Sequence, residues 1–136
     1  MHKNAYALLV GGNTEITTMN GVQLIQRGLP GGALLRGAEI MEIELETYRE
    51  LAHDTRKRST IRNQRLSPIT SERVLMMTEV YILAVEYFAS HEKAVRWLHK
   101  PNLNLRYVSP ISLCDTVLGM RVLKEEIQKL KHGLLC

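Results

Sequence analysis

The sequence has few aromatic residues, few cysteines and no long hydrophobic run. Phenylalanine, tryptophan and tyrosine make up 5% of the 136 residues, which favours aliphatic packing between helices over a β-sandwich or barrel. Cys114 and Cys136 have no CxxC or Cys/His spacing around them, so they predict neither a disulfide framework nor a zinc site. No apolar run approaches the roughly 18 residues of a membrane span, and no charged leader precedes an apolar segment. We therefore expect a cytoplasmic protein with no membrane contact.

The sequence arrangements of common enzymes are also missing. We find no GxSxG, phosphate-binding loop, dinucleotide fingerprint or HExxH. His91 and His99 could align on one face of a short helix, but ordinary surface histidines explain this spacing equally well. Glu125 and Glu126 are adjacent, so on a helix they point in different directions and form no carboxylate pair. The sequence therefore predicts a protein that is not an enzyme and has no cofactor, metal or small-molecule substrate.

What is present is an ordinary globular composition, with 45% hydrophobic residues and a net charge of +4. The length suits one domain, or two small helical modules that share a core. Acidic residues concentrate between Glu39 and Asp54, and basic residues follow at once between Arg56 and Arg65. Two interpretations remain open: a pair of solvated surfaces, or a basic element that contacts phosphates.

The first twenty residues carry only weak signals of regular structure. Ala5–Val10 is a short apolar run that Gly11 and Gly12 break, and we expect a brief strand or an arm. Residues 20–29 predict a helix that ends at Gly28, with an inward side formed by Val22, Leu24 and Ile25.

Helical periodicity is stronger from Ala33 to about His53, where one long helix and two short ones fit equally well. Residues 55–65 have few apolar anchors and predict a poorly buried helix or a loop. Ser67-Pro68 is a helix start signal, since serine can cap and proline suits the first helical position. The helix that follows, to about Ala89, is apolar on almost every side, so we expect it to be central.

The last fifty residues predict three further helices. Ser90 can cap a helix over residues 91–99, which Pro101 ends after a core-facing triad of Ala94, Trp97 and Leu98. A loop over residues 101–108 leads to a second Ser-Pro start and a short helix to about Asp115. Gly119 then separates this helix from the last one, over residues 120–132, which stops at Gly133 and buries Leu123, Ile127, Leu130 and, less clearly, Val122.

The order of these elements resembles the toxin-binding domain of Xre/MbcA/ParS-type antitoxins. That family typically has a helix with A..WL, a PN..L loop, a T-P-L helix start, a glycine and a terminal helix ending in glycine. The matching positions here are Ala94, Trp97, Leu98, Pro101, Asn102, Leu105, Ser109, Pro110, Ile111, Leu113, Thr116, Gly119 and Gly133. Upstream, Gly28-Leu29-Pro30 resembles the start of the family's helix-turn-helix half, and Leu66-Ser67-Pro68 resembles the segment before its connecting helix. The family often has glycines where this chain has Arg106 and Tyr107.

The resemblance implies an all-α fold, in which a degenerate helix-turn-helix half is joined by a long central helix to a small helical toxin-binding domain. We place an N-terminal arm at residues 1–19, the Xre-like region at 20–72, and the connecting helix with the toxin-binding domain at 73–136. The implied function is that of a dimeric type II antitoxin. It would block the active site of a cognate RES-domain toxin, which consumes NAD⁺, and would repress its own operon by binding operator DNA.

The resemblance and the basic run together select the expected contact residues. Toxin contacts are expected at Arg106, Tyr107, Arg121, Lys124, Gln128, Lys131, His132, Gly133, Leu134, Leu135 and Cys136. The two leucines after the predicted helix stop would suit a groove, and Lys131 and His132 would suit a cleft that binds an anionic dinucleotide. Contacts with DNA phosphates are expected at Arg56, Lys57, Arg58, Thr60, Arg62 and Arg65. Two alternatives remain: a stand-alone transcription regulator that uses its C-terminal half only to dimerise, and an adaptor that binds another partner through the same surface.

Overall fold

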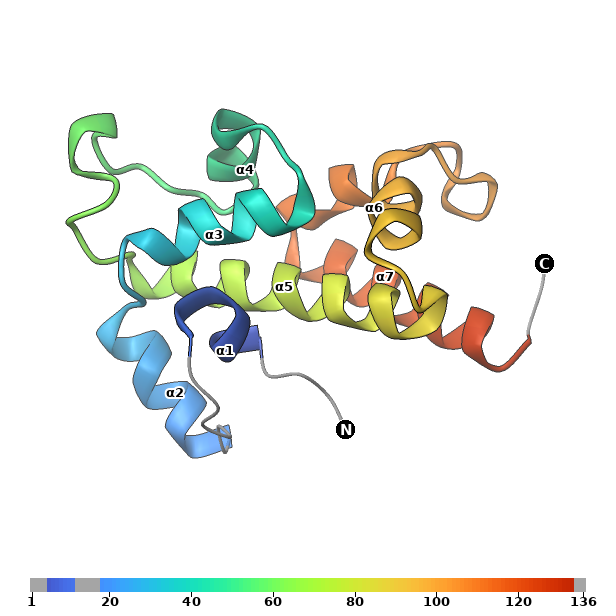
Figure 1. Ribbon diagram of the computed structural model, residues 1–136, viewed down its shortest axis with the longest axis horizontal. Helices are drawn as coiled ribbons and strands as arrows, with labels where there is room; N and C mark the ends of the chain where they lie inside the picture. Colours follow the sequence, from blue (N-terminus) through green and yellow to red (C-terminus); the bar gives the residue numbers. More distant parts are fainter. Residues whose placement is uncertain (1–4, 12–17, 134–136) are drawn as a thin grey trace. The chain divides into compact units, whose positions relative to one another are not determined.

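The computed structural model describes residues 5–11 and 18–133, which form helices joined by loops (Figure 1). Over these residues there is no strand, and the sole β-type pairing is an isolated bridge between Asn102 and Val108. The predicted all-α fold is therefore confirmed. The chain divides into two compact units, residues 1–78 and 79–136, and the long helix α5 (Pro68–Phe88) contributes its first half to one unit and its second half to the other.

The first unit begins with α1 (Ala5–Val10), which packs against α3 (Gly32–Met41). Ala5 and Leu9 are both buried, and four residues separate them, so they lie on the same side of a helix. The expected strand or arm is therefore wrong for this segment. Its apolar residues bury one helical stripe, which an isolated six-residue run does not reveal.

Helix α2 (Thr18–Arg27) ends where expected, at Gly28, whose φ of +89° is a left-handed conformation that suits glycine. Leu24 and Ile25 are half-buried, as their predicted inward position requires. Val22 is exposed, and this part of the prediction is wrong. None of residues 19–27 is fully buried, so the helix lies at the surface and covers only a narrow apolar side.

The segment after Gly32 forms two short helices, α3 and α4 (Leu45–Leu51), and not one long one. Glu42 ends α3 with a left-handed backbone (φ 53°), and the Glu44 carboxylate then caps α4 by accepting from the Glu46 N–H at 2.8 Å. Residues 55–65 form a loop with one 3-10 turn, η1 (Arg58–Thr60). Of the two alternatives that the sequence allows here, the loop is confirmed.

Helix α5 starts at Pro68, and the Ser67 hydroxyl accepts a hydrogen bond from the Thr70 N–H at 3.1 Å. The Ser-Pro start signal is thus confirmed. Helix α5 has buried residues in both of its halves and so contributes to the core of each unit; they include Val74, Met77, Val80, Tyr81, Ile82 and Ala84.

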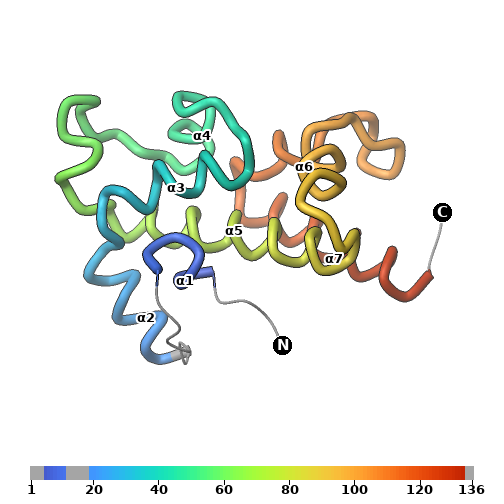
Figure 2. Tube along the Cα trace, in the orientation of Figure 1, coloured from blue at the N-terminus to red at the C-terminus, as the bar shows by residue number. Residues whose placement is uncertain are grey.

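The second unit continues from α5 into α6 (His91–His99), η2 (Leu103–Leu105), η3 (Pro110–Asp115) and α7 (Val117–Lys131) (Figure 2). The Ser90 hydroxyl caps α6 by accepting from the Lys93 N–H at 3.2 Å, as predicted. Both α6 and α7 pack on η3. The core of this unit includes Ala94, Leu98, Leu105, Ile111, Cys114, Met120, Leu123 and Ile127.

Gly119 does not separate two helices, as the sequence suggested, but lies inside the first turn of α7. The Thr116 hydroxyl caps this helix by accepting from the Gly119 N–H at 2.9 Å. A side chain at position 119 would collide with the backbone carbonyl of Leu113 in η3. The glycine is therefore needed because η3 and the start of α7 approach each other closely, and not because the helix is interrupted.

Candidate functional site

The loop of residues 101–108 is built around Asn102. Its side-chain oxygen accepts from the Asn104 N–H at 2.8 Å, its N–H donates to the Val108 carbonyl at 3.0 Å, and its carbonyl accepts from the Tyr107 N–H at 2.9 Å. Leu105 is buried and anchors the loop in the core of the second unit. The loop is also held on α7, because the Asn104 amide donates to the buried Glu126 carboxylate at 3.0 Å.

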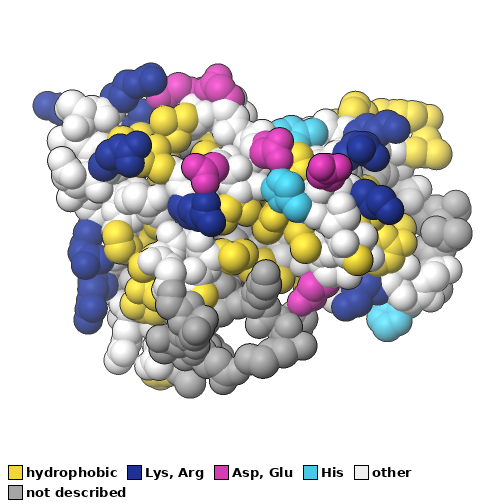
Figure 3. All heavy atoms as spheres, viewed as in Figure 1, with side chains coloured by type: hydrophobic (Ala, Val, Ile, Leu, Met, Phe, Trp, Pro, Cys, Tyr) yellow, Lys and Arg dark blue, Asp and Glu magenta, His cyan; other side chains and the backbone are white. Residues whose placement is uncertain are grey.

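Apolar side chains are exposed at the tip of this loop. Leu103 and Tyr107 are 69% and 72% exposed, and Figure 3 shows hydrophobic side chains gathered over this part of the second unit. Arg106 and Tyr107 both have left-handed backbones, with φ of 59° and 66°. A side chain beyond glycine makes this conformation costly by roughly 1–2 kcal/mol per residue. The loop thus holds two large side chains in solvent at positions that glycine would occupy with less strain.

An exposed apolar row on α7 leads toward the same loop. Leu118 and Val122 precede Glu126 by eight and four residues, so the three lie along one side of the helix. Leu118 and Val122 are exposed, whereas Glu126 is covered by the loop residue Asn104. These exposed apolar residues of the second unit, two in the loop and two on α7, are together called the loop–α7 surface: Leu103, Tyr107, Leu118 and Val122.

The predicted toxin contacts on α7 lie on a different side of that helix. Spacings of three and four residues align Arg121, Lys124, Gln128 and Lys131 along one stripe. Lys124 is half-buried and pairs with Glu79 of α5 at 3.2 Å, while His132 and Gly133 are exposed. Gly133 has the predicted left-handed φ of +70° just after the helix.

Four of the predicted toxin contacts thus share one stripe of α7, whereas Arg106 and Tyr107 belong to the loop of residues 101–108. Leu134, Leu135 and Cys136 lie outside the described residues. Of the apolar residues predicted to be buried in this helix, Leu123 and Ile127 are in the core, Leu130 is half-buried and Val122 is exposed.

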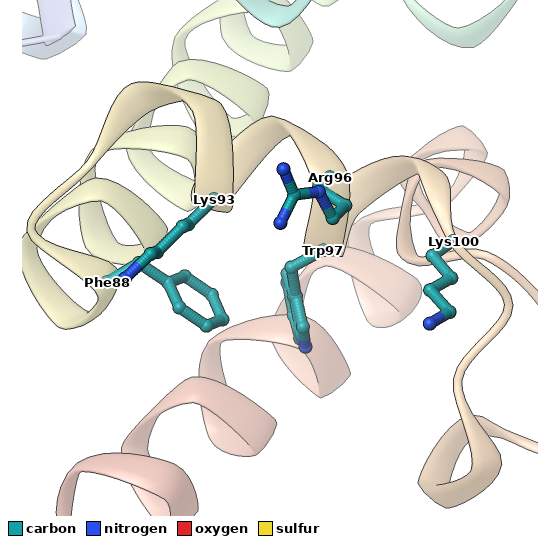
Figure 4. Close-up of a pocket in the computed structure, with 5 residues that line it drawn as sticks. All are labelled: Phe88, Lys93, Arg96, Trp97 and Lys100. Carbon is teal, nitrogen blue, oxygen red and sulfur yellow. The ribbon is translucent and has the colours of Figure 1, made fainter.

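Trp97 is not a core residue, which corrects the prediction of a core-facing triad; Ala94 and Leu98 are fully buried, but Trp97 is only half-buried. Its indole ring lies 6.2 Å from the ring of Phe88, centroid to centroid, at an interplanar angle of 47°. The two rings line a shallow pocket of about 310 Å³ that is largely open to solvent (Figure 4). The other lining residues are Lys93, Arg96 and Lys100.

The basic loop of the first unit is organised by Asp54. Its carboxylate accepts from Arg49 Nε at 3.0 Å and from Arg56 Nε at 2.8 Å. Burial by itself would raise the pKa of Asp54, but the hydrogen bonds from Arg56 and Arg49 outweigh it and hold the pKa below its ordinary value. Arg56 also donates to the carbonyls of Ile61 and Gln64, so its guanidinium, which is almost fully buried, holds the loop together.

The other predicted DNA contacts differ in whether their side chains already bind another group of the protein. Arg58 pairs with Glu46 at 2.9 Å at the surface, and Arg65 donates to the Gly28 carbonyl at 2.7 Å. The Thr60 hydroxyl lies 2.9 Å from the Lys57 carbonyl, to which it donates. Lys57 and Arg62 are exposed and make no ion pair within the part of the chain that the structure describes. The acidic and basic blocks seen in the sequence are thus partly paired with each other.

Several kinds of chemistry find no support in the described residues. Burial, and secondarily the charge of Asp115, raise the pKa of the Cys114 thiol to about 12, so it stays protonated at neutral pH. No group of three or more metal-ligating side chains occurs in residues 5–11 and 18–133. Across the same residues, no helix has the length and apolar character needed to span a bilayer.

These observations define a small all-helical unit with an exposed apolar loop, which is typical of a protein-binding domain. Residues 83–133 match the family model of the antitoxin Xre/MbcA/ParS C-terminal toxin-binding domain. The match runs from the end of α5 to Gly133, and it confirms the resemblance that the sequence motifs indicate. No curated protein matches the chain.

The structure also explains the motif positions. Pro101 ends α6, Asn102 closes the loop, Leu105 anchors it, and Gly119 permits the approach of η3 to α7. Sequence reasoning missed Leu103, Leu118 and the cavity beside Trp97. For the pocket a signal was available, since Lys93, Arg96 and Trp97 are spaced by three and one residues and so share one helix face, and Lys100 follows three residues later at the helix end.

Proposed function

We propose that this protein is an antitoxin that binds a toxin enzyme through the loop–α7 surface and neutralises it. The observation that carries the proposal is the loop tip: Leu103 and Tyr107 are largely exposed, and Tyr107 is held in a left-handed backbone within the segment that matches the toxin-binding domain. Strained conformations persist where the surrounding structure fixes them, and they often mark functional positions. Exposed apolar side chains cost solubility unless a partner covers them.

The partner that the family resemblance favours is a RES-domain toxin that consumes NAD⁺. Arg121 and Lys131 lie on one stripe of α7, are exposed and supply positive charge, which suits the mouth of a cleft that binds an anionic dinucleotide. His132, which follows directly after the helix, is a further proposed contact there. Arg106, Lys124, Gln128 and Gly133 remain proposed contacts on the same unit. Leu134, Leu135 and Cys136 also remain proposed contacts.

The test is capture of the partner by the tagged chain expressed from its native locus, followed by identification of the retained protein and by a measurement of NAD⁺ loss when that protein is released. A loop variant, Leu103→Ser with Tyr107→Ser, should capture less toxin. The matched control is Met19→Ser with Ile69→Ser, since these residues are 67% and 63% exposed and lie in the first unit. Equal toxin capture by the two variants would contradict the proposed surface.

We further propose that the first unit binds operator DNA and thereby represses the operon. The support is the exposed positive charge of Lys57 and Arg62 around η1, next to Arg58, which is exposed but pairs with Glu46. Affinity should fall with salt at a log–log slope of about −0.9 for each phosphate neutralised. A Lys57→Gln, Arg62→Gln variant should show a flatter slope than the wild-type chain. If the wild-type affinity does not change with salt, this part of the function is wrong.

A stand-alone regulator would use the second unit only to dimerise. Capture of no protein partner, together with retention of a specific DNA, would favour that alternative. Homodimer formation belongs to both functions, and sedimentation analysis of the purified chain would measure it.

A further inference from the structure

The pocket beside Trp97 is lined by aromatic and basic residues, none of which belongs to the proposed toxin contacts. Its floor consists of two aromatic rings, Phe88 from the end of α5 and Trp97 from α6. Figure 4 shows the two rings next to each other, with Lys93 on the Phe88 side, Arg96 beside Trp97, and Lys100 on the other side of Trp97. None of the described residues that line the cavity is acidic.

The three basic side chains of the pocket have no carboxylate partner among the described residues. Over the described residues, Lys93, Arg96 and Lys100 make no ion pair with a carboxylate. All three are exposed, in contrast to Arg49 and Arg56, which are buried in a pair with Asp54. An apolar floor with an unpaired cationic rim favours a ligand that is both apolar and anionic.

The spacing of the cations discriminates between kinds of anionic ligand. Seven residues separate Lys93 in α6 from Lys100, the residue that follows the helix end, which is about 10 Å along the helix axis at 1.5 Å per residue. A single phosphate is too small to contact both ends of this row. An extended peptide advances about 3.3 Å per residue, so carboxylates three residues apart would match it. The pocket is open and, at about 310 Å³, lies at the lower limit for ligand sites, so it suits one or two side chains of a longer partner.

We propose that this cavity, the Phe88–Trp97 pocket, binds an acidic segment of a partner protein that inserts an apolar side chain between carboxylates. The apolar side chain occupies the floor between Phe88 and Trp97, and the flanking carboxylates pair with Lys93, Arg96 and Lys100. This inference goes beyond the proposed function, because the pocket contains none of the residues assigned to toxin or DNA binding.

Trp97 makes the pocket directly observable, since it is the one tryptophan of the chain. The probe is a capped six-residue peptide with a central Leu-Phe pair and two Asp or Glu residues on each side. It contains no tryptophan, so any change in tryptophan emission comes from Trp97. We expect a saturable blue shift of that emission, because the bound peptide removes water from the half-buried indole. A peptide with Lys in place of every acidic residue should leave the emission unchanged.

A matched pair of charge variants tests the rim. Lys93→Gln with Lys100→Gln should weaken peptide binding about fivefold, since an exposed ion pair contributes a factor of roughly two to three. Arg27→Gln with Lys129→Gln removes the same charge from exposed sites outside the pocket and should leave the affinity unchanged. Equal urea midpoints for the two variants show that folding is not the cause of the difference.

Four outcomes would overturn the proposal. The acidic peptide fails to shift the emission, the basic peptide shifts it equally, or the two charge variants weaken binding by the same factor. The fourth outcome identifies a different ligand: adenosine monophosphate shifts the Trp97 emission at lower concentration than the peptide, with the same dependence on Lys93 and Lys100.

Discussion

Removal of the Asp54 carboxylate should destabilise the first unit more than any surface substitution. Its side chain is 2% exposed, and it accepts hydrogen bonds from Arg49 and Arg56, which are themselves nearly buried. In the Asp54→Ala variant two guanidinium groups lose their shared counter-charge. Breaking a buried ion pair from one side typically costs about 3–5 kcal/mol, because the remaining charge stays desolvated. That is a large part of the 5–15 kcal/mol by which folded domains are typically stable.

The chain contains a suitable control in the Arg36–Glu39 pair. Both of these side chains are at least half exposed, so Glu39→Ala should change the free energy of unfolding by about 0–1 kcal/mol. Urea unfolding followed by far-ultraviolet circular dichroism measures both variants at neutral pH. Trp97 fluorescence reports the second unit separately, and we expect a smaller change there.

The pH dependence of the same variant tests the electrostatic origin of the effect. The pKa of Asp54 is lowered in the folded chain from an ordinary value of 3.8, so the folded state favours the ionised carboxylate. A lowered pKa contributes stability above the unfolded value, and this contribution is lost as the pH falls through the folded value. The gap between the wild-type chain and Asp54→Ala should therefore be widest near neutral pH and narrow below about pH 4. A gap under 1 kcal/mol at neutral pH, or one that stays constant on acidification, would refute the reasoning.

Further predictions concern the second unit. Gly119→Ala should lower the free energy of unfolding by about 1–3 kcal/mol, and with it the thermal midpoint, because the added methyl group would collide with the η3 backbone. In Gly32→Ala the methyl group meets open space, so this control variant should be neutral or slightly stabilising. Tyr107→Gly should raise the free energy of unfolding by up to about 1 kcal/mol by relieving its left-handed backbone, and yet weaken toxin capture. In a Cys136→Ser variant, the Cys114 thiol should resist a thiol reagent at pH 8 until urea unfolds the chain, because it is fully buried; rapid labelling of the folded variant would contradict this placement.

The sequence predicted the helices of the second unit well because their ends carry local signals. Ser90 caps α6 and Pro101 ends it, and a left-handed Gly133 follows α7. These signals act through hydrogen bonds and backbone angles within a few residues, so they can be read without knowing what the helix packs against. The same holds for Ser67-Pro68 at the start of α5.

The errors occurred where packing between distant residues decides the conformation. Ala5–Val10 became helical because two of its residues bury one turn apart against α3. Gly119 lies within a helix because η3 approaches it, and the sequence shows the glycine but not the neighbour. Trp97 has the spacing of a core residue, and only the folded unit shows that its ring lies half in solvent beside Phe88.

The all-α class, the order of the C-terminal helices and the resemblance to an antitoxin domain could thus be read from the sequence, because capping, proline and glycine signals are local. Tertiary structure decided which side chains remain available for binding. In the folded chain Arg56 is buried in a pair with Asp54, and the Tyr107 side chain is exposed to solvent. Lys93, Arg96 and Lys100 line the same pocket as the rings of Phe88 and Trp97. Availability depends on which surfaces the rest of the chain covers, and residue type and spacing along the sequence do not specify that.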